Sequence, residues 1–206
     1  QTVRCQETSF DLRHHLDLTP DDLIFFIPSG IRRVKNVTFC LKPLDSLRIR
    51  YPQVKAVFVG PVIEAAEGAR LWEALRDYPW AFYLGPVPHE QICAMLTSVD
   101  VVINSSLSEG GMANSILEAM SRGRAVLASD IEGNRSVVRD GIDGLLFASE
   151  TEFADKAERL IREPGLRHEL GRNGQEKIER EFSGEREIHD YLRLYQEAIG
   201  TGSRSS

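Results

Sequence analysis

The chain has 206 residues and carries 25 basic against 31 acidic side chains, which gives a formal net charge of −6. A chain of this length favours one domain and can bury roughly 70% of its unfolded surface, so a core needs no disulfide or metal to hold it. The acidic balance argues against a nucleic-acid partner held by overall charge. No apolar run approaches the ~18 residues of a membrane-spanning helix.

Short apolar runs typical of strands alternate with helix-like runs along most of the chain. The strand-like runs lack a clean polar and apolar alternation, which is typical of strands buried on both faces of a parallel sheet. Strands are predicted at residues 23–28, 54–59, 81–84, 99–104, 125–129 and 145–147. Helices are predicted at residues 37–49, 64–76, 89–96, 113–122, 134–139, 150–162, 164–180 and 185–199. The pattern predicts a doubly wound, Rossmann-like α/β domain with extra C-terminal helices.

The predicted elements place one domain at residues 23–200. Residues 1–22 are expected to form a linker or approach segment, and the Gly/Ser-rich residues 201–206 a flexible tail. Because the sequence starts at Gln1 and not at Met, we expect it to be a piece of a longer protein.

The three cysteines, Cys5, Cys40 and Cys93, are far apart and lack the spacing of metal ligands. We therefore expect free thiols, a reducing compartment and a cytoplasmic location. The sequence also lacks the Asp-x-Asp, His-x-His and His-Glu-x-x-His patterns that hold metals, so no metal site and no cofactor are expected.

The turn after the first predicted strand is basic. It begins at Gly30 and carries Arg32, Arg33 and Lys35 before the next helix. In a doubly wound sheet a ligand lies outside the carboxyl ends of the strands, where helix starts favour anions. Arg32 and Lys35 would suit a diphosphate there, whereas the alternative is an ordinary solvated basic loop.

A second candidate segment follows the fourth predicted strand. A loop with Gly110 and Gly111 leads into a helix, and the carboxylates Glu109 and Glu118 flank it. Loop amides could face a phosphate, and carboxylates could accept hydrogen bonds from sugar hydroxyls. The alternatives are a solvated acid at Glu109 and a purely structural Glu118, in a capping box with Ser115 or paired with Arg122.

The order of these motifs resembles a known family. A strand is followed by Ser106-x-x-Glu109-Gly110, by a helix containing Leu117-Glu118-Ala119-Met120, and by a further apolar strand and Gly133-Asn134. This order resembles the C-terminal, donor-binding half of retaining GT-B glycosyltransferases, in particular glycosyltransferase family 4, the "glycosyl transferases group 1". The resemblance implies half of a GT-B fold and transfer of a hexose-like unit from a nucleoside-diphosphate sugar. It also implies an N-terminal acceptor domain that this sequence lacks, so the chain alone is expected to be inactive.

The resemblance also assigns roles to particular residues. Arg32 and Lys35 would contact the diphosphate beside Gly30, Glu109 the donor sugar and Glu118 the ribose. Val87 would lie beside the base. The amides that would approach the sugar and the distal phosphate are those of Gly110, Gly111, Met112, Ala113 and Asn114.

The sequence departs from the family pattern in two places. Eight residues separate Glu109 from Glu118, whereas the family has seven, and Gly110-Gly111 is where the extra residue fits best. Arg32 and Lys35 are also closer together than is usual in the family. Both departures fall on residues expected to meet the diphosphate or the sugar.

Other functions compete with a transferase. One is a non-catalytic module that binds a nucleotide sugar or another phosphorylated ligand, and another is a GT-B-like epimerase or phosphorylase. For a transferase, the expected partners are a nucleotide-sugar donor and an unidentified saccharide, lipid or small-molecule acceptor. The missing half could hold the protein at a membrane surface.

Overall fold

The computed structural model describes residues 10–181 of the chain, and these residues form a parallel six-stranded sheet in the order β3-β2-β1-β4-β5-β6. Four of the predicted strands match the structure to the residue, and the other two are shorter than predicted. The strands are β1 (Leu23–Pro28), β2 (Val54–Val59), β3 (Ala81–Tyr83), β4 (Val101–Asn104), β5 (Ala125–Ser129) and β6 (Leu145–Phe147).

The helices largely follow the predicted ranges. They are α1 (Leu12–His15), α2 (Leu41–Arg48), α3 (Ala65–Asp77), α4 (His89–Leu96), α5 (Asn114–Ser121), α6 (Glu132–Arg135), α7 (Glu150–Arg162) and α8 (Pro164–Glu181). The helix predicted at 37–49 is divided into a 3-10 turn, η2 (Val37–Cys40), and α2. Helix α1 lies within the segment expected to be a linker, and the helix predicted at 185–199 and the tail at 201–206 lie outside the described residues.

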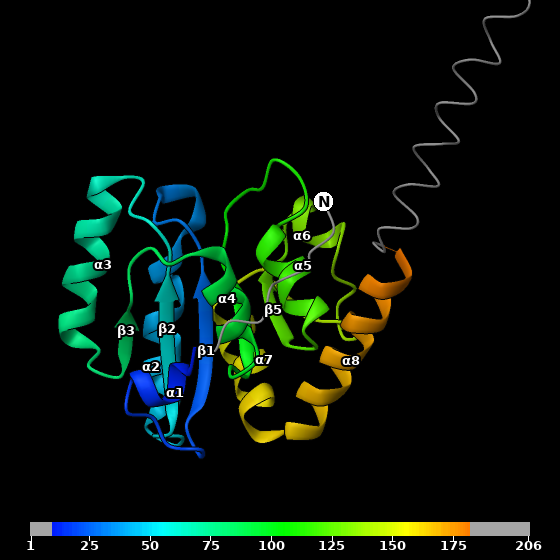
Figure 1. The fold of residues 1–206 in the computed structure, drawn as a ribbon, viewed down its shortest axis with the longest axis horizontal. Coiled ribbons are helices and arrows are strands. Elements are labelled where there is room, and N and C mark those ends of the chain that lie inside the picture. Colours follow the sequence, from blue (N-terminus) through cyan, green and yellow to red (C-terminus); the bar gives the residue numbers. More distant parts are fainter. Residues whose placement is uncertain (1–9, 182–206) are drawn as a thin grey trace, which may run out of the picture.

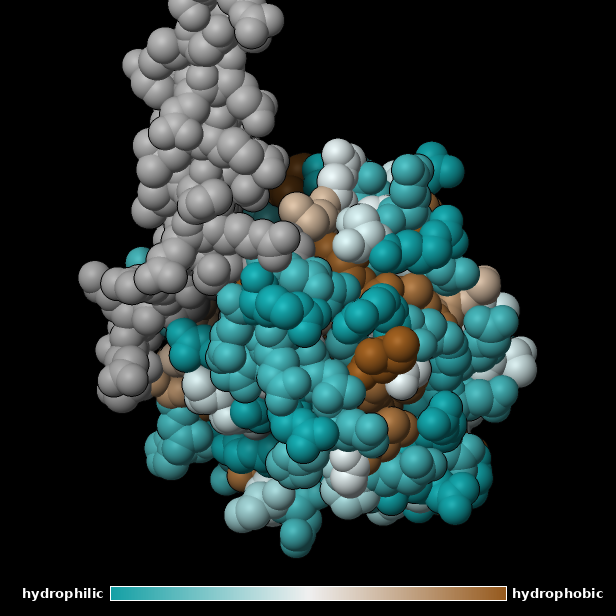
Figure 2. Space-filling view, turned by 90° about the vertical axis from the view of Figure 1, so that its right-hand side faces the viewer, coloured by the Kyte–Doolittle hydropathy of each residue, from teal (hydrophilic) through white to brown (hydrophobic). Residues whose placement is uncertain are grey.

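Burial on both faces of the sheet explains the unbroken apolar strands. Along β1, Leu23, Phe25 and Ile27 point into one core cluster, whereas Ile24 and Phe26 point into another. The first cluster packs the sheet against α2 and α7 and the second packs it against α4 and α5. Figure 1 shows α3 at one end of the molecule and α8 at the other. The surface at the α8 end is mostly hydrophilic, with small apolar areas (Figure 2).

The strand order places a topological switch point at the centre of the sheet. β1 pairs with β2 on one side and with β4 on the other, so the connections that follow β1 and β4 leave in different directions. A ligand in a doubly wound sheet binds at such a switch point, outside the carboxyl ends of the strands. The basic turn follows β1 and the Glu109 loop follows β4, so both candidate segments lie at this switch point.

Two further findings concern the cysteines and membranes. Cys40 is a buried free thiol, but Cys93 is disulfide-bonded, so the expectation that all the cysteines are free is wrong for Cys93. Within residues 10–181, no helix is both long enough and apolar enough to cross a membrane.

Candidate functional site

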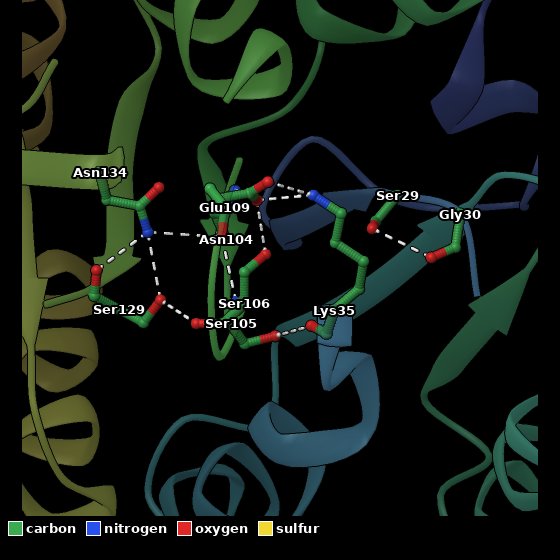
Figure 3. Close-up of polar contacts among 9 residues, drawn as sticks. All are labelled: Ser29, Gly30, Lys35, Asn104, Ser105, Ser106, Glu109, Ser129 and Asn134. Carbon is green, nitrogen blue, oxygen red and sulfur yellow. Dashed lines mark hydrogen bonds and ion pairs between the residues drawn. The ribbon is translucent and has the colours of Figure 1, made fainter. Parts of the chain in front are cut away.

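The two candidate segments meet in an ion pair. Lys35 Nζ lies 2.6 Å from Glu109 Oε1 and 2.7 Å from Glu109 Oε2 (Figure 3). Only 17% of the lysine side chain and 10% of the glutamate side chain are exposed. A cation from the end of β1 therefore faces a carboxylate from the end of β4, across the switch point of the sheet.

Glu109 has further hydrogen-bond donors at the end of β4. Ser106 Oγ donates to Glu109 Oε1 at 2.7 Å, and Asn104 Nδ2 donates to the same oxygen at 3.2 Å. Burial raises the pKa of Glu109, but the hydrogen bonds from Lys35, Ser106 and Asn104 outweigh it and hold the pKa below its ordinary value. The carboxylate is thus held as an anion.

Hydrogen bonds also hold the two loops to one another. Ser105 Oγ donates to the carbonyl oxygens of Lys35 at 3.1 Å and Asn36 at 3.0 Å, and Leu107 N donates to Val34 O at 2.8 Å. Asn36 has a left-handed backbone, with φ of 46°, and ends the η1 turn (Arg33–Lys35). The loop backbones around Lys35 and Glu109 are therefore fixed to one another.

Residues at and just after the end of β5 hold the groups that donate hydrogen bonds to Glu109. Asn134 Nδ2 donates to Ser129 O at 2.9 Å, to Ser129 Oγ at 3.1 Å and to Asn104 Oδ1 at 3.5 Å. Ser129 Oγ in turn donates to Ser106 O at 2.6 Å. Figure 3 shows these groups as one network that runs from β5 to the residues that hold Glu109.

Arg32 and Gly30 lie in the loop that leads from β1 to η1, the turn that contains Lys35. Arg32 is half-buried just before η1, and its Nε is buried with no hydrogen-bond partner in the described part of the chain. A Cβ at Gly30 would lie 2.5 Å from the tip of the Ile63 side chain. The structure therefore places both residues at the end of β1 but does not include Arg32 in the ion pair.

The loop between the two glutamates is open. A Cβ at Gly110 or Gly111 would meet no atom within 4 Å, and neither residue has a positive φ. Ala113 precedes α5 and offers no side-chain cap, so the first amides of α5, which begins at Asn114, have no side-chain partner from it. Met112 is 48% exposed. Nothing in the packing of the loop itself requires glycine.

Glu118 lies on α5 and has a different environment. Its Oε1 is 3.9 Å from His89 Nε2 at the start of α4, and 15% of its side chain is exposed. Burial raises the pKa of Glu118 above its ordinary value, and the nearby His89 only partly opposes this shift. Val87, two residues before His89, is half-buried and packs against the core cluster that lies between the sheet and helices α4 and α5.

The structural alternatives for Glu118 do not form. Because α5 begins at Asn114 with Ala113 as its N-cap, Ser115 lies inside the helix and makes no capping box. Among the ion pairs of residues 10–181, none joins Glu118 to Arg122. The same residues contain no group of three or more His, Cys, Asp or Glu side chains placed to hold a metal ion.

The sequence profile of the glycosyl transferases group 1 family matches residues 10–177. The chain belongs to this family. Glycosyltransferase 1 domain-containing protein 1 of Xenopus tropicalis is 29% identical over 171 residues, covering 83% of this chain and 49% of the relative.

Solved structures share the fold of this glycosyl transferases group 1 chain. Anabaena Alr3699/HepE, solved in complex with UDP, matches with a TM-score of 0.79 and 20% identity, over 92% of this chain and 51% of HepE. The C-terminal domain of the group 1 protein LpcC from Francisella tularensis matches with a TM-score of 0.72 and 21% identity, over 82% of this chain and 90% of that domain. The predicted fold class, an α/β Rossmann-like half of a GT-B fold, is confirmed. The chain spans about half the length of HepE and of the Xenopus relative.

Within this member of the family, the predicted site residues occupy four places. Lys35 and Glu109 are in direct contact, and Arg32 and Gly30 lie in the loop between β1 and η1. The residues from Gly110 to Asn114 form the open loop and the start of α5, and Glu118 and Val87 lie toward α4.

Four buried polar residues of the hydrogen-bond network are not among the predicted site residues. These are Asn104, Ser106, Ser129 and Asn134, and each is at most 9% exposed. For Asn104 and Ser129 the available signal was a polar residue at the end of an otherwise apolar strand, and Ser106 and Asn134 belong to the motifs that carry the family resemblance.

Proposed function

We propose that residues 23–200 are the donor-binding, C-terminal domain of a retaining glycosyltransferase of family 4. Residues 1–22 would approach this domain from an acceptor-binding half elsewhere in the protein. The enzyme would move a hexosyl unit from a nucleoside-diphosphate sugar to an acceptor, in the cytoplasm and without a metal. The match to a C-terminal domain of a group 1 protein supports this assignment, and so does the fold shared with HepE, which was solved with UDP and with UDP-glucose.

The observation that carries the proposal is the contact between Lys35 and Glu109 at the switch point of the sheet. A diphosphate that enters beside β1 would compete with the carboxylate for the Lys35 ammonium group. Glu109, kept ionised by Ser106 and Asn104, would then be available to accept hydrogen bonds from the sugar hydroxyls. One pair of residues would therefore serve the two ends of the bond that breaks.

Positive charge on the β1 side would assist the departure of the nucleoside diphosphate. Negative charge develops on the distal phosphate as the bond to the sugar breaks, and fixed cations stabilise it most where water is excluded. Lys35 would supply one cation, and Arg32, with its Nε lacking a partner in the described residues, would supply the second. Guanidinium groups can fork across two phosphate oxygens.

The open loop offers backbone donors to the same ligand. Because neither the packing nor the backbone angles of Gly110 and Gly111 require glycine, close approach of a ligand is a sufficient reason for these residues. The amides from Gly110 to Asn114 would meet the distal phosphate and the sugar at the start of α5. Helix α5 has no side-chain cap from Ala113 that such a ligand would need to displace.

The nucleoside would bind toward α4. Glu118 has no strong donor in the described structure, and two ribose hydroxyls would supply donors for its two oxygens. Val87 precedes α4, so the segment that contains it would lie beside the base. The acceptor and its orientation would come from the other half of the enzyme, so this chain alone should bind the donor without transferring it.

Calorimetry on this chain tests donor binding. UDP and UDP-glucose should bind and raise the melting temperature, whereas uridine, which lacks phosphate, should do neither. A ligand at 100 times its Kd stabilises a protein by about 2.7 kcal/mol, which is readily measured. If no nucleoside diphosphate from a panel of uridine, guanosine and adenosine compounds binds, the proposal is wrong.

Product analysis separates transfer from the alternatives. The longer protein should move sugar only when an acceptor is present, and this chain alone should not. Conversion of the nucleotide sugar without an acceptor would indicate an epimerase. Binding without turnover in the longer protein would indicate a non-catalytic module.

A further inference from the structure

Gly133 lies so close to the Glu109 loop that no larger residue fits. A Cβ at Gly133 would stand 2.6 Å from Gly111 O and 2.7 Å from Glu109 Cβ. Real Cβ atoms essentially never approach other atoms so closely, and one of these neighbours is backbone. The first turn of α6 therefore packs directly against the aliphatic part of the Glu109 side chain.

The backbone of Gly133 does not itself require glycine. Gly133 is the second residue of α6 and has no positive φ, so alanine would favour the local conformation. The contact with the Glu109 loop is what excludes a side chain there. Gly133 is thus held by a tertiary contact with a residue of the candidate site.

The next residue holds Glu109 by a different route. Asn134 is fully buried and donates to Asn104 Oδ1 at 3.5 Å, while Asn104 Nδ2 donates to Glu109 Oε1 at 3.2 Å. Asn134 also donates to Ser129, whose hydroxyl donates to Ser106 O at 2.6 Å. Two consecutive residues therefore act on Glu109. Gly133 does so by steric contact with the aliphatic part of its side chain, and Asn134 does so by hydrogen bonds to Asn104 and Ser129, which Figure 3 shows.

We propose that Gly133 and Asn134 are positioning residues, which set the place of the Glu109 carboxylate opposite Lys35. They thereby set how well the site distinguishes a nucleotide sugar from the bare nucleoside diphosphate. This discrimination rests on the proposed function, in which Glu109 meets the sugar and Lys35 the diphosphate. A shift of Glu109 away from α6 changes its contact with the sugar and leaves the nucleoside end of the site in place.

The first experiment compares ligand affinities in glycine variants. Gly133→Ala should lower the affinity for UDP-glucose by tenfold or more. It should lower the affinity for UDP, which would meet the Gly111 loop and Lys35 but not the sugar position, by a smaller factor, so that the ratio of the two affinities falls. Gly144→Ala is the matched control, because its Cβ would meet Val138 Cγ1 at 2.7 Å, a similar clash that does not involve Glu109. Gly165→Ala, with nothing within 4 Å, controls for the added methyl group alone. Both controls should leave the ratio of the two affinities unchanged.

A second variant covers the case in which Gly133→Ala fails to fold. Asn134→Ser is smaller than the native residue and removes the donation to Asn104, so it should lower the same affinity ratio to a lesser degree. An equal change in the ratio for Gly144→Ala, or no change for Gly133→Ala and Asn134→Ser, would overturn the proposal.

A ligand-free measurement separates this inference from the proposed function. The Glu109 carboxyl carbon can be followed by NMR as the pH changes, with Glu109→Gln assigning the signal. In Gly133→Ala the pKa of Glu109 should rise toward its ordinary value as its hydrogen bonds loosen, and in Gly144→Ala it should stay low. If the wild-type chain binds no nucleotide, the proposed function fails but this titration still tests the positioning. An unchanged pKa in Gly133→Ala would refute it.

Discussion

Glu109 and Glu118 belong to one loop–helix segment, yet their hydrogen-bonding environments differ and their pKa values shift in opposite directions. Glu109 receives hydrogen bonds from Lys35, Ser106 and Asn104, whereas within residues 10–181 Glu118 has only His89 nearby, at 3.9 Å. Both are largely buried, but the pKa of Glu109 is lowered and that of Glu118 is raised. Burial alone therefore does not decide the charge of a carboxyl group, because the donors that the fold supplies also count. The described structure supplies Glu109 with three hydrogen-bond donors, and it supplies Glu118 with none of comparable strength.

Of the predicted changes, removal of the Lys35 charge should have the largest effect, and it should act on the free energy of unfolding. Lys35→Met leaves Glu109 ionised and largely buried without its main partner, and loss of one member of a buried pair costs about 3–5 kcal/mol. Because both side chains keep some exposure, we expect the unfolding free energy to fall by about 2–3 kcal/mol in urea titrations.

Two further variants make the Lys35 result specific. The double variant Lys35→Met/Glu109→Gln removes both charges and should regain most of the lost stability. Lys42→Met is the control, because Lys42 is 77% exposed and pairs with Glu150 at the surface, so its loss should cost no more than about 0.5 kcal/mol. Equal losses at Lys35 and Lys42 would show that the pair at the site is no more than a surface contact.

Glu118→Gln should act on binding and not on folding. If Glu118 accepts hydrogen bonds from the ribose, the variant should lose about 1.5–3 kcal/mol of UDP affinity in calorimetry, as expected for hydrogen bonds to a charged group. Its unfolding free energy should not fall, because burial already disfavours the charged form. Glu73→Gln, an exposed residue of α3, should change neither quantity. Unchanged affinity with a lower melting temperature would instead make Glu118 a structural residue.

The two carboxyl groups should give pH dependences of opposite sign. Glu109 has a lowered pKa, so its contribution to stability is present above the ordinary value of 4.5 and is lost as the pH falls through the folded pKa. Glu118 has a raised pKa, so its contribution is fully present below 4.5 and is lost as the pH rises through the folded pKa.

Urea unfolding between about pH 3 and pH 7 measures this contrast. The stability of the wild type relative to Glu109→Gln should increase with pH, and that relative to Glu118→Gln should decrease. One proton limits each slope to about 1.4 kcal/mol per pH unit. Slopes of the same sign would mean that the two sites do not differ as described.

Removal of divalent metal should have no effect, the smallest of the expected changes. If Lys35 and Arg32 neutralise the diphosphate, UDP should bind with the same affinity in EDTA as in Mg²⁺. Calorimetry in the two buffers measures the difference. Weaker binding in EDTA would show that a metal ion, and not Lys35 and Arg32 alone, neutralises the diphosphate.

Much of the fold could be predicted because the strands carry a strong local signal. The apolar runs of β1, β2, β5 and β6 are bounded by turn residues, and their predicted limits match the structure. Helix limits were less accurate where the backbone changes direction. The left-handed Asn36 ends η1, and η2 and α2 then replace the single helix predicted at 37–49. A side chain pattern does not reveal such a turn in advance.

The candidate site was predictable where a charged residue lies in a loop between a strand and a helix. Lys35 and Glu109 stand out because each follows a strand and precedes a helix. Gly133 and Asn134 matter because β5 lies beside β4, and this neighbour relation comes from the sheet and not from spacing along the chain. Position relative to α5 likewise rules out the capping box for Glu118, because a helix that begins at Asn114 leaves Ser115 unable to cap it.

The separation of Lys35 and Glu109 along the chain, 74 positions, also has a consequence during synthesis. At about 5–20 residues per second, a ribosome adds the carboxylate roughly 4–15 s after the lysine. In that interval β1 can pair with β2, but its other edge has no partner until β4, which ends at Asn104, is added shortly before Glu109. Asn134 is added later still. The nascent chain therefore completes this network only after most of the sheet has been made, and β1 keeps one unpaired edge for most of the interval.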